Sequence, residues 1–357
     1  MPKPSVIAAA AVAGAVLVAP ASAPSASAPT LEQLVGQHLL IRMQGSTPTP
    51  SLLARIRNGQ IGGVVLFGNN ASPARVPALV AELQAAAHAG GQLPLLIATD
   101  QEGGAVKRLP GPPTVAPSAM TSAAIARAQG LATGRYLKRV GVNADLAPVL
   151  DVPESRADFI DSRAFATSSA AVASRGVAFA QGVVAAGVVA TVKHFPGLGR
   201  LTSSTDYSPQ TVGASRASLN RDLAPFRRAI AVGIPALMVG TARYPAFGDG
   251  LPAACSPSIV TTLLRRRLGF RGVTLSDDLD TAAVWTQIPP PQAAVRAVEV
   301  GIDMVYIAGV GGSGGDAIGE RAYAALLHAA EDGSLPRPAL ESSYARIRAL
   351  KARFAAA

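Results

Sequence analysis

The chain of 357 residues contains one cysteine, Cys255. A single thiol excludes an internal disulfide. Because Cys255 lies far from the N-terminus, it cannot carry a lipid anchor there. Repeats of fixed period and long low-complexity stretches are also absent from the body of the chain. Since 49% of the residues are hydrophobic and only 15% are charged, the composition excludes a disordered chain and predicts a large buried core.

Aromatic residues make up only 4% of the chain. That is too few for a protein that binds single-stranded nucleic acid by stacking its bases. The formal net charge is +10 and comes mostly from scattered arginines, with one cluster at Arg265, Arg266 and Arg267. We interpret that cluster as a solvated helix end, so nucleic acid is not an expected partner.

The N-terminus has the layout of a secretory signal peptide. Lys3 precedes the apolar run "VIAAAAVAGAVLVA", and the small-residue stretch "PASAPSASAP" follows it. The run is shorter than the stretch of about 20 apolar residues that a membrane span needs. We therefore expect residues 1–29 to be a signal peptide and processing region, and residues 30–357 to be an exported domain without a stable membrane anchor. The cleavage position stays open, because prolines follow both Ala23 and Ala28.

Beyond residue 30, short apolar runs alternate with helical patterns. Several runs are almost continuous in Val, Ile and Leu, as expected for parallel strands covered on both sides. Eight such alternations predict a single (β/α)8 barrel of the α/β class, with a doubly wound open sheet as the alternative. The predicted strands cover residues 38–43, 61–67, 93–99, 142–149, 188–193, 234–239, 272–276 and 302–307.

The helices between these strands have recognisable ends. Ser256 and Pro257 supply an N-cap and a first-turn proline, and Gly269 ends the same helix. Ser72 and Pro73 begin another helix in the same way. The apolar face of the first helix consists of Val260, Leu263, Leu264 and Leu268.

In a (β/α)8 barrel the functional groups lie at the carboxyl ends of the strands. Asp100 follows the third strand, where it could also simply cap a turn, and Arg163 lies in the loop after the fourth, where it could be solvated. Lys193 and His194 end the fifth strand. A buried ammonium group is costly unless it has a partner or a task, so Lys193 is the stronger candidate.

Asp277 and Asp278 follow the seventh strand. Because they are consecutive, their side chains leave in opposite directions, so that one can face the mouth of the barrel and the other the surrounding loops. The remaining histidines, His38, His88 and His328, fall at a strand start and in two helices, and we expect them to be structural or solvated.

Three motifs in this order, "TDQEGG", "KHFPG" and "GFRGVTLSDDLD", resemble those of glycoside hydrolase family 3, in particular its single-domain β-N-acetylglucosaminidases. The similarity extends over nearly the whole predicted domain and includes "LAPVLDV", "DSRAF" and "GIDMVYI". Each motif is weak alone, but their order makes the resemblance specific. It implies a hydrolase of terminal β-linked sugars, in this case N-acetylglucosamine.

The resemblance implies that Asp277 is the nucleophile of a retaining mechanism, in which a covalent glycosyl-enzyme forms and is then hydrolysed. The resemblance also implies that the sugar hydroxyls are bound by Asp100, Arg108, Arg163, Lys193 and His194. This chemistry suits the residue types, because Lys and Arg only donate hydrogen bonds and an ionised Asp only accepts them. No metal or other cofactor is implied, and the sequence has no His/Cys cluster of the zinc-binding kind.

The general acid/base is the point where this sequence departs from the resemblance. The similar enzymes carry an Asp–His dyad in the loop after K-H-F-P-G, but here Ser204 and Asp206 occupy those two positions and Leu198 replaces a further histidine. Three interpretations stay open. Asp206 could itself be the acid/base, brought in by a mobile loop. Glu102 or Glu154 could serve instead. Otherwise the protein binds sugar and cleaves it slowly.

Other functions also fit the residues. A β-glucosidase or β-xylosidase of the same family is one, although many of those carry a further C-terminal domain, whereas this chain ends near its last predicted barrel helix. A Schiff-base aldolase would use Lys193. Water is the expected acceptor of the sugar, with phosphate as an alternative. Secretion and the basic surface suggest amino sugars derived from cell walls as substrates.

Overall fold

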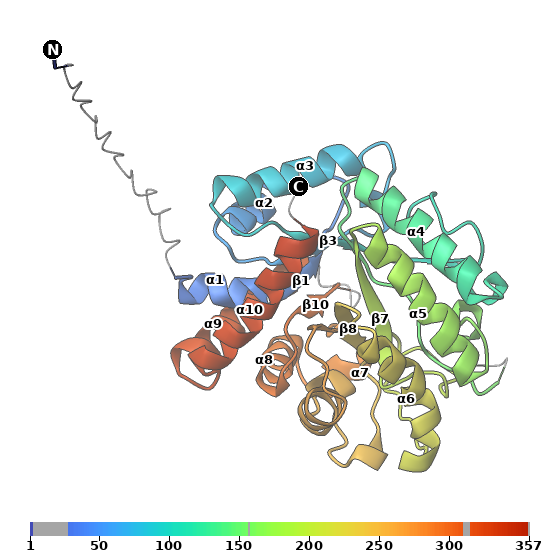
Figure 1. The fold of residues 1–357 in the computed structure, drawn as a ribbon. Coiled ribbons are helices and arrows are strands. Elements are labelled where there is room, and N and C mark those ends of the chain that lie inside the picture. Colours follow the sequence, from blue (N-terminus) through green and yellow to red (C-terminus); the bar gives the residue numbers. More distant parts are fainter. Residues whose placement is uncertain (3–27, 156–157, 310–314, 356–357) are drawn as a thin grey trace.

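The computed structural model describes residues 1–2, 28–155, 158–309 and 315–355. Parallel strands form one barrel in the order β10-β1-β2-β3-β6-β7-β8-β9. A single bridge between Leu275 and Met304 joins its two ends, so the predicted (β/α)8 barrel is confirmed and the open sheet is wrong (Figure 1). The barrel strands are β1 (Leu39–Arg42), β2 (Gly63–Val65), β3 (Leu96–Thr99), β6 (Ala144–Asp145), β7 (Val189–Phe195), β8 (Ala236–Val239), β9 (Val273–Ser276) and β10 (Val305–Ile307).

Helices surround this barrel (Figure 1). A two-stranded hairpin, β4 (Gln101–Gly103) with β5 (Val106–Lys107), follows β3, and its turn uses Gly103 and Gly104, whose φ angles are +100° and +61°. The α-helices are α1 (Leu31–Gln37), α2 (Pro50–Arg57), α3 (Val76–Ala89), α4 (Ala123–Arg139), α5 (Ser169–Ala185), α6 (Arg216–Ala231), α7 (Ala282–Trp285), α8 (Pro290–Val300), α9 (Gly315–Glu331) and α10 (Arg337–Phe354).

The helix predicted after Ser256 is present as η6 (Ser258–Arg267), wound as a π-helix. The Ser256 hydroxyl accepts a hydrogen bond from the Ile259 amide at 3.1 Å, and Gly269 has a φ of +70° just after the helix ends. The start predicted for the other helix, at Ser72 and Pro73, comes before the observed one. Although the Ser72 carbonyl accepts from the amides of the next turn, α3 begins only at Val76.

Arg265 corrects the prediction of a solvated arginine cluster. Its side chain is only 17% exposed and donates to the Asp303 carboxylate at 2.6 Å, while Arg266 and Arg267 are exposed. His38 is buried, with its Nδ1 2.6 Å from the Asp303 carbonyl oxygen. His88 and His328 are exposed, as predicted.

The inside of the barrel is a packed core. Inward-facing side chains of the strands, such as Leu40, Leu96 and Leu275, form one buried cluster with Ile347 and Phe354 of α10. Since α10 packs against this interior, a ligand cannot pass through the barrel, and the carboxyl ends of the strands are the place for a site.

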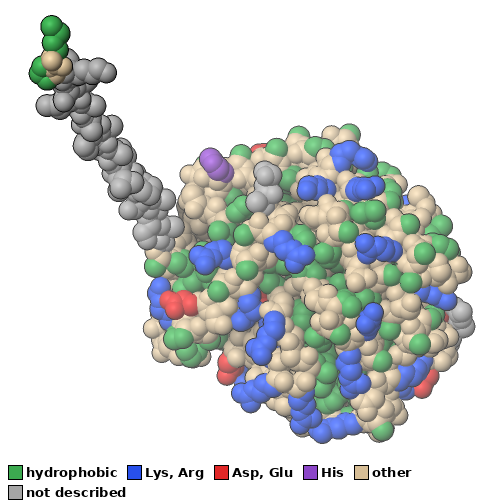
Figure 2. Space-filling view, in the orientation of Figure 1, with side chains coloured by type: hydrophobic (Ala, Val, Ile, Leu, Met, Phe, Trp, Pro, Cys, Tyr) green, Lys and Arg blue, Asp and Glu red, His purple; other side chains and the backbone are tan. Residues whose placement is uncertain are grey.

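Positive side chains are scattered over the face of the molecule that Figure 2 shows, without a continuous stripe. Cys255 is fully buried. The predicted signal peptide falls mostly on residues 3–27, outside the described residues. Among the described helices, none is both long and apolar enough to cross a membrane.

Candidate active site

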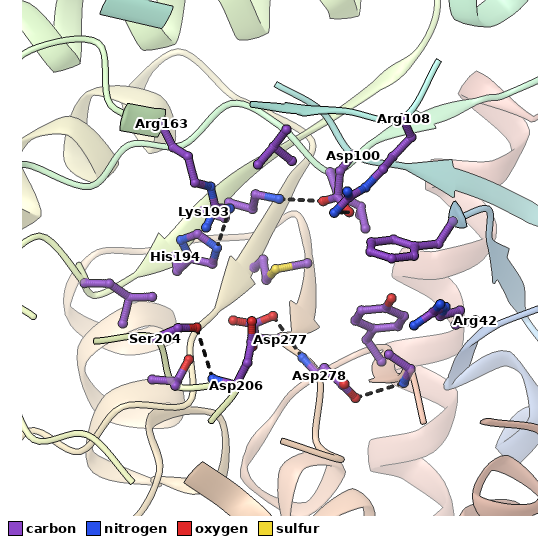
Figure 3. Close-up of a pocket in the computed structure, with 18 of the residues that line it drawn as sticks. Arg42, Asp100, Arg108, Arg163, Lys193, His194, Ser204, Asp206, Asp277 and Asp278 are labelled. Atoms are coloured by element: carbon purple, nitrogen blue, oxygen red, sulfur yellow. Dashed lines mark hydrogen bonds and ion pairs between the residues drawn. The ribbon is translucent and has the colours of Figure 1, made fainter. Parts of the chain in front are cut away.

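A cavity of about 250 Å³ lies at the carboxyl ends of the barrel strands. All the residues predicted for the site line it: Asp100, Arg108, Arg163, Lys193, His194, Asp206 and Asp277 (Figure 3). Four of these residues follow or end a strand, and the others come from the hairpin or from loops. The barrel therefore brings together groups that are separated by up to half of the sequence.

Lys193 is the centre of a buried ion-pair network. The residue is 3% exposed, and its Nζ lies 2.7 Å from Asp100 Oδ1 and 2.8 Å from Glu102 Oε1. Arg163 binds the same Glu102 carboxylate through two hydrogen bonds of 2.7 and 2.9 Å. Burial alone would lower the pKa of Lys193, but the charges of Asp100 and Glu102 outweigh it and raise that pKa. The network thus fixes a protonated Lys193 beside the cavity.

Glu102 has a structural role that the sequence did not reveal. Its side chain is only 1% exposed, and although burial opposes ionisation, Arg163 and Lys193 hold the pKa of Glu102 far below its usual range. A carboxylate held in its ionised form by two cations is a poor proton donor, so these ion pairs disfavour Glu102 as the acid. Glu154 is disfavoured as well, because its half-exposed side chain pairs with Arg200 and does not line the cavity.

His194 is oriented by a residue that sequence reasoning missed, Asp151. The imidazole Nδ1 lies 2.7 Å from Asp151 Oδ2, and the Asp151 carboxylate also accepts from the Leu198 amide at 2.7 Å. Nε2 of His194 lies 3.5 Å from a nitrogen of Arg163. Asp151 thereby ties the end of β7 to the loop that follows. Its place in "LAPVLDV", just after the predicted strand of residues 142–149, was the available signal.

Asp277 and Asp278 follow β9 and have different environments. Asp277 is half-buried and faces the cavity (Figure 3). Asp278 is 4% exposed, and its Oδ1 accepts from the amides of Ala308 and Asp280 at 2.8 and 3.0 Å. Burial raises the pKa of Asp278 to about 8. Of the two carboxyl groups, Asp277 is thus the more accessible to a ligand in the cavity.

The loop after β7 carries Asp206 to the cavity. The carbonyls of Asp206 and Thr205 accept from the first amides of α7, those of Ala282 and Ala283, both at 3.2 Å. The Ser204 hydroxyl accepts from the Asp206 amide at 3.1 Å. Partial burial, followed by the negative charge of Asp277, raises the pKa of Asp206. The two carboxyl groups are neighbours in Figure 3.

Arg42 and Phe67 also line the cavity and were not predicted. They lie at and just beyond the carboxyl ends of β1 and β2. Arg42 could have been found from the sequence, because it is a charged residue at the end of an apolar strand. The guanidinium carbons of Arg42 and Arg108 lie 4.2 and 3.8 Å from the centre of the Phe67 ring.

A (β/α)8 barrel whose rim presents carboxylates together with buried lysine and arginine groups has the features of an enzyme that binds a polyhydroxylated ligand. Residues 30–350 match the family model "Glycosyl hydrolase family 3 N terminal domain". The chain belongs to glycosyl hydrolase family 3.

Known proteins resemble the chain over most of its length. It is 34% identical to a protein of Arthroderma benhamiae named an uncharacterized secreted glycosyl hydrolase, over 90% of this chain and 93% of that one. It is 34% identical to a β-hexosaminidase of Nitrosomonas eutropha, over 75% and 80%. Among solved structures, a family 3 β-N-acetylglucosaminidase from Paenibacillus has a TM-score of 0.87 at 35% identity, but the match covers 92% of this chain and only 63% of that longer one. A β-N-acetylhexosaminidase from Beutenbergia cavernae has a TM-score of 0.83 at 32% identity, over 91% and 99%.

Proposed function

We propose that this protein is an exo-acting, retaining β-N-acetylhexosaminidase that releases terminal N-acetylglucosamine. One observation carries the proposal: Asp277 faces the same cavity as the fixed group of Asp100, Lys193, Arg163 and His194. The names of the relatives from Nitrosomonas and Beutenbergia support this choice of sugar. A β-glucosidase of the same family is the alternative that the geometry leaves open.

In the proposed reaction, the ion-paired residues bind the hydroxyls of the terminal sugar and orient its anomeric carbon toward Asp277. A carboxylate oxygen of Asp277 forms a bond to that carbon as the bond to the leaving oxygen breaks, and Asp206 protonates the leaving oxygen. Asp206, now ionised, then takes a proton from water. The resulting hydroxide attacks the anomeric carbon, which frees both the sugar and the Asp277 carboxylate.

Asp206 is the proposed acid/base for two reasons. Its pKa is raised, which is what a general acid needs, whereas Asp278, whose pKa is also raised, is almost fully buried and accepts hydrogen bonds from the Ala308 and Asp280 amides. Hydrogen bonds from α7 to its own carbonyl and to that of Thr205 hold the loop against the cavity. The earlier expectation of a mobile loop remains a prediction.

The geometry disfavours the aldolase alternative. A Schiff-base lysine must lose its proton to attack a carbonyl. Lys193 instead binds two carboxylates and has a raised pKa. We also propose that residues 1–29 are removed during export and that residues 30–357 are the catalytic domain. The word "secreted" in the name of the Arthroderma relative supports export, and cell-wall amino sugars are the proposed source of substrate.

The test is hydrolysis of para-nitrophenyl N-acetyl-β-glucosaminide and of the β-glucoside by wild type, Asp277→Ala and Asp206→Ala. Asp332→Ala, a change in an exposed carboxylate, is the matched control. We expect Asp277→Ala to lose activity on both substrates. Asp206→Ala should lose about 10²–10⁴-fold on poor leaving groups but much less on para-nitrophenol, and azide should rescue it.

A wild type that hydrolyses neither substrate would make the protein a sugar-binding member of the family. Full activity of Asp206→Ala on poor leaving groups would remove Asp206 as the acid/base. Adding phosphate tests which molecule accepts the sugar. If sugar 1-phosphate forms, phosphate replaces water as the acceptor in the proposed reaction.

A further inference from the structure

One wall of the cavity carries more positive charge than its neighbours neutralise. We call it the arginine wall, and it consists of Arg42, Phe67 and Arg108. The two guanidinium groups stack on the one aromatic ring, with their carbons 4.2 and 3.8 Å from its centre. Two cations share a single π system there, which brings their charges close together.

The donors of the arginine wall are poorly satisfied. The Nε atoms of Arg42 and Arg108 are both buried without a hydrogen-bond partner. Arg42 forms no ion pair within the described ranges. The carboxylate nearest to Arg108 is Asp100, at 3.7 Å, and Asp100 already binds Lys193 at 2.7 Å. Guanidinium groups pair well with carboxylates and phosphates, so the unpaired donors of the arginine wall suit an anionic group of a ligand.

The wall lies away from the leaving-group side of the proposed reaction. In Figure 3, Asp206 and Arg42 are on opposite sides of Asp277. A leaving group has to be near Asp206, which protonates it. A group at Arg42 therefore belongs to the terminal sugar itself, on the edge remote from the bond that is cleaved. In a hexose, carbon 6 is the exocyclic carbon, and its hydroxyl can carry a phosphate ester or be oxidised to a carboxylate.

We propose that the arginine wall binds an anionic group on carbon 6 of the terminal sugar, and that Arg42 sets this specificity. A phosphate ester and a carboxylate share the required chemistry: both present oxygens that a guanidinium fork binds through paired hydrogen bonds. The inference rests on the proposed function, since it uses Asp277 and Asp206 to orient the sugar.

The experiment compares kcat/KM for para-nitrophenyl N-acetyl-β-glucosaminide and for its 6-phosphate. A charge-assisted contact that the neutral sugar lacks should favour the 6-phosphate by about 10- to 100-fold in wild type. In Arg42→Met the ratio should fall to about one. Arg266→Met, the same change at an exposed arginine of η6, should keep the wild-type ratio. Melting temperatures of both variants check that the fold is intact.

A second pair of substrates, the para-nitrophenyl β-glucuronide and β-glucoside, separates the two anions. A preference for the 6-phosphate identifies the ester, and a preference for the glucuronide identifies the carboxylate. If wild type hydrolyses the neutral sugars and prefers them to both anionic ones, or if Arg42→Met keeps an anionic preference, the inference is wrong while the proposed function stands.

If wild type hydrolyses none of these substrates, calorimetric titration with N-acetylglucosamine and its 6-phosphate decides. Tighter binding of the phosphate that Arg42→Met loses supports the arginine wall, although the proposed function has then failed. Equal binding of the two sugars, or no binding, overturns both.

Discussion

Replacing Glu102 with glutamine tests whether the buried ion-pair network positions the site. The change keeps the size of the side chain and removes its charge. Glu102 accepts two hydrogen bonds from Arg163 and lies 2.8 Å from Lys193 Nζ. A glutamine amide has one acceptor oxygen, and its NH2 group would face a cation. Arg163 would lose its only carboxylate partner among the described residues.

The expected cost follows from burial. The Glu102 side chain is 1% exposed, and breaking a buried pair by altering one partner typically costs about 3–5 kcal/mol. Since domains are stable by about 5–15 kcal/mol, the variant should still fold at room temperature. Arg163 and Lys193 would lose a fixed position, and displacing substrate-positioning groups by about 1 Å can cost roughly 10²-fold in rate. We therefore expect kcat/KM to fall by about 10- to 100-fold.

Urea denaturation measures the first effect and kinetics on the para-nitrophenyl substrate the second. Glu154→Gln is the matched control, because Glu154 also pairs with an arginine at 2.7 Å but its side chain is 58% exposed. An exposed pair is worth about 1 kcal/mol or less. If Glu102→Gln loses no more stability than Glu154→Gln and keeps its activity, the network does not position the site.

Two further predictions concern buried groups away from the cavity. Burial lowers the pKa of Lys351 in α10 to about 7, so between the unfolded pKa of about 10.4 and pH 7 only the unfolded state gains the proton. The free energy of unfolding is therefore highest above the unfolded pKa and falls by up to about 4 kcal/mol as the pH drops to 7. The hydrogen bonds that Lys351 donates to Gln37 and Gly62 make this loss smaller. The free energy of unfolding of Lys351→Met, measured by urea denaturation, should therefore rise relative to that of wild type as the pH falls over that range. A difference between the two proteins that does not change with pH would contradict this. Cys255 is fully buried with a pKa raised to about 12, so a thiol reagent at pH 8 should label it only after unfolding; rapid labelling of the native protein would show that the site opens.

The eight strands could be predicted because parallel strands in a barrel are buried on both faces and leave nearly continuous apolar runs. The residues at which these strands begin and end could not be predicted. The prediction for β6 covered residues 142–149, but only Ala144 and Asp145 pair regularly with the neighbouring strands. Apolar residues beyond the ladder, such as Val142 and Leu146, are equally buried, and the sequence pattern reports burial and not hydrogen bonding.

Site residues at strand ends could also be predicted, since the fold itself brings those ends together. Residues whose role depends on a distant partner could not. Arg265 looked like a member of a solvated cluster, because its partner Asp303 is 38 positions away. Glu102 looked like a possible acid, because nothing in the sequence indicates that Arg163 and Lys193 both bind it. Arg42 has no conspicuous neighbour in sequence, and only the arrangement of the barrel places it against Phe67.

The position of Asp206 beside Asp277 has a physical consequence for the proposed mechanism. In this site partial burial and then the negative charge of Asp277 raise the pKa of Asp206, which favours the protonated form of Asp206. Once Asp277 forms a glycosyl ester, that negative charge is gone, and the pKa of Asp206 must fall by the part that Asp277 contributed. The same group would then be ionised when a base is needed to activate water. The charge of a neighbouring nucleophile can thus switch Asp206 from acid to base between the two steps, without a histidine to carry the proton.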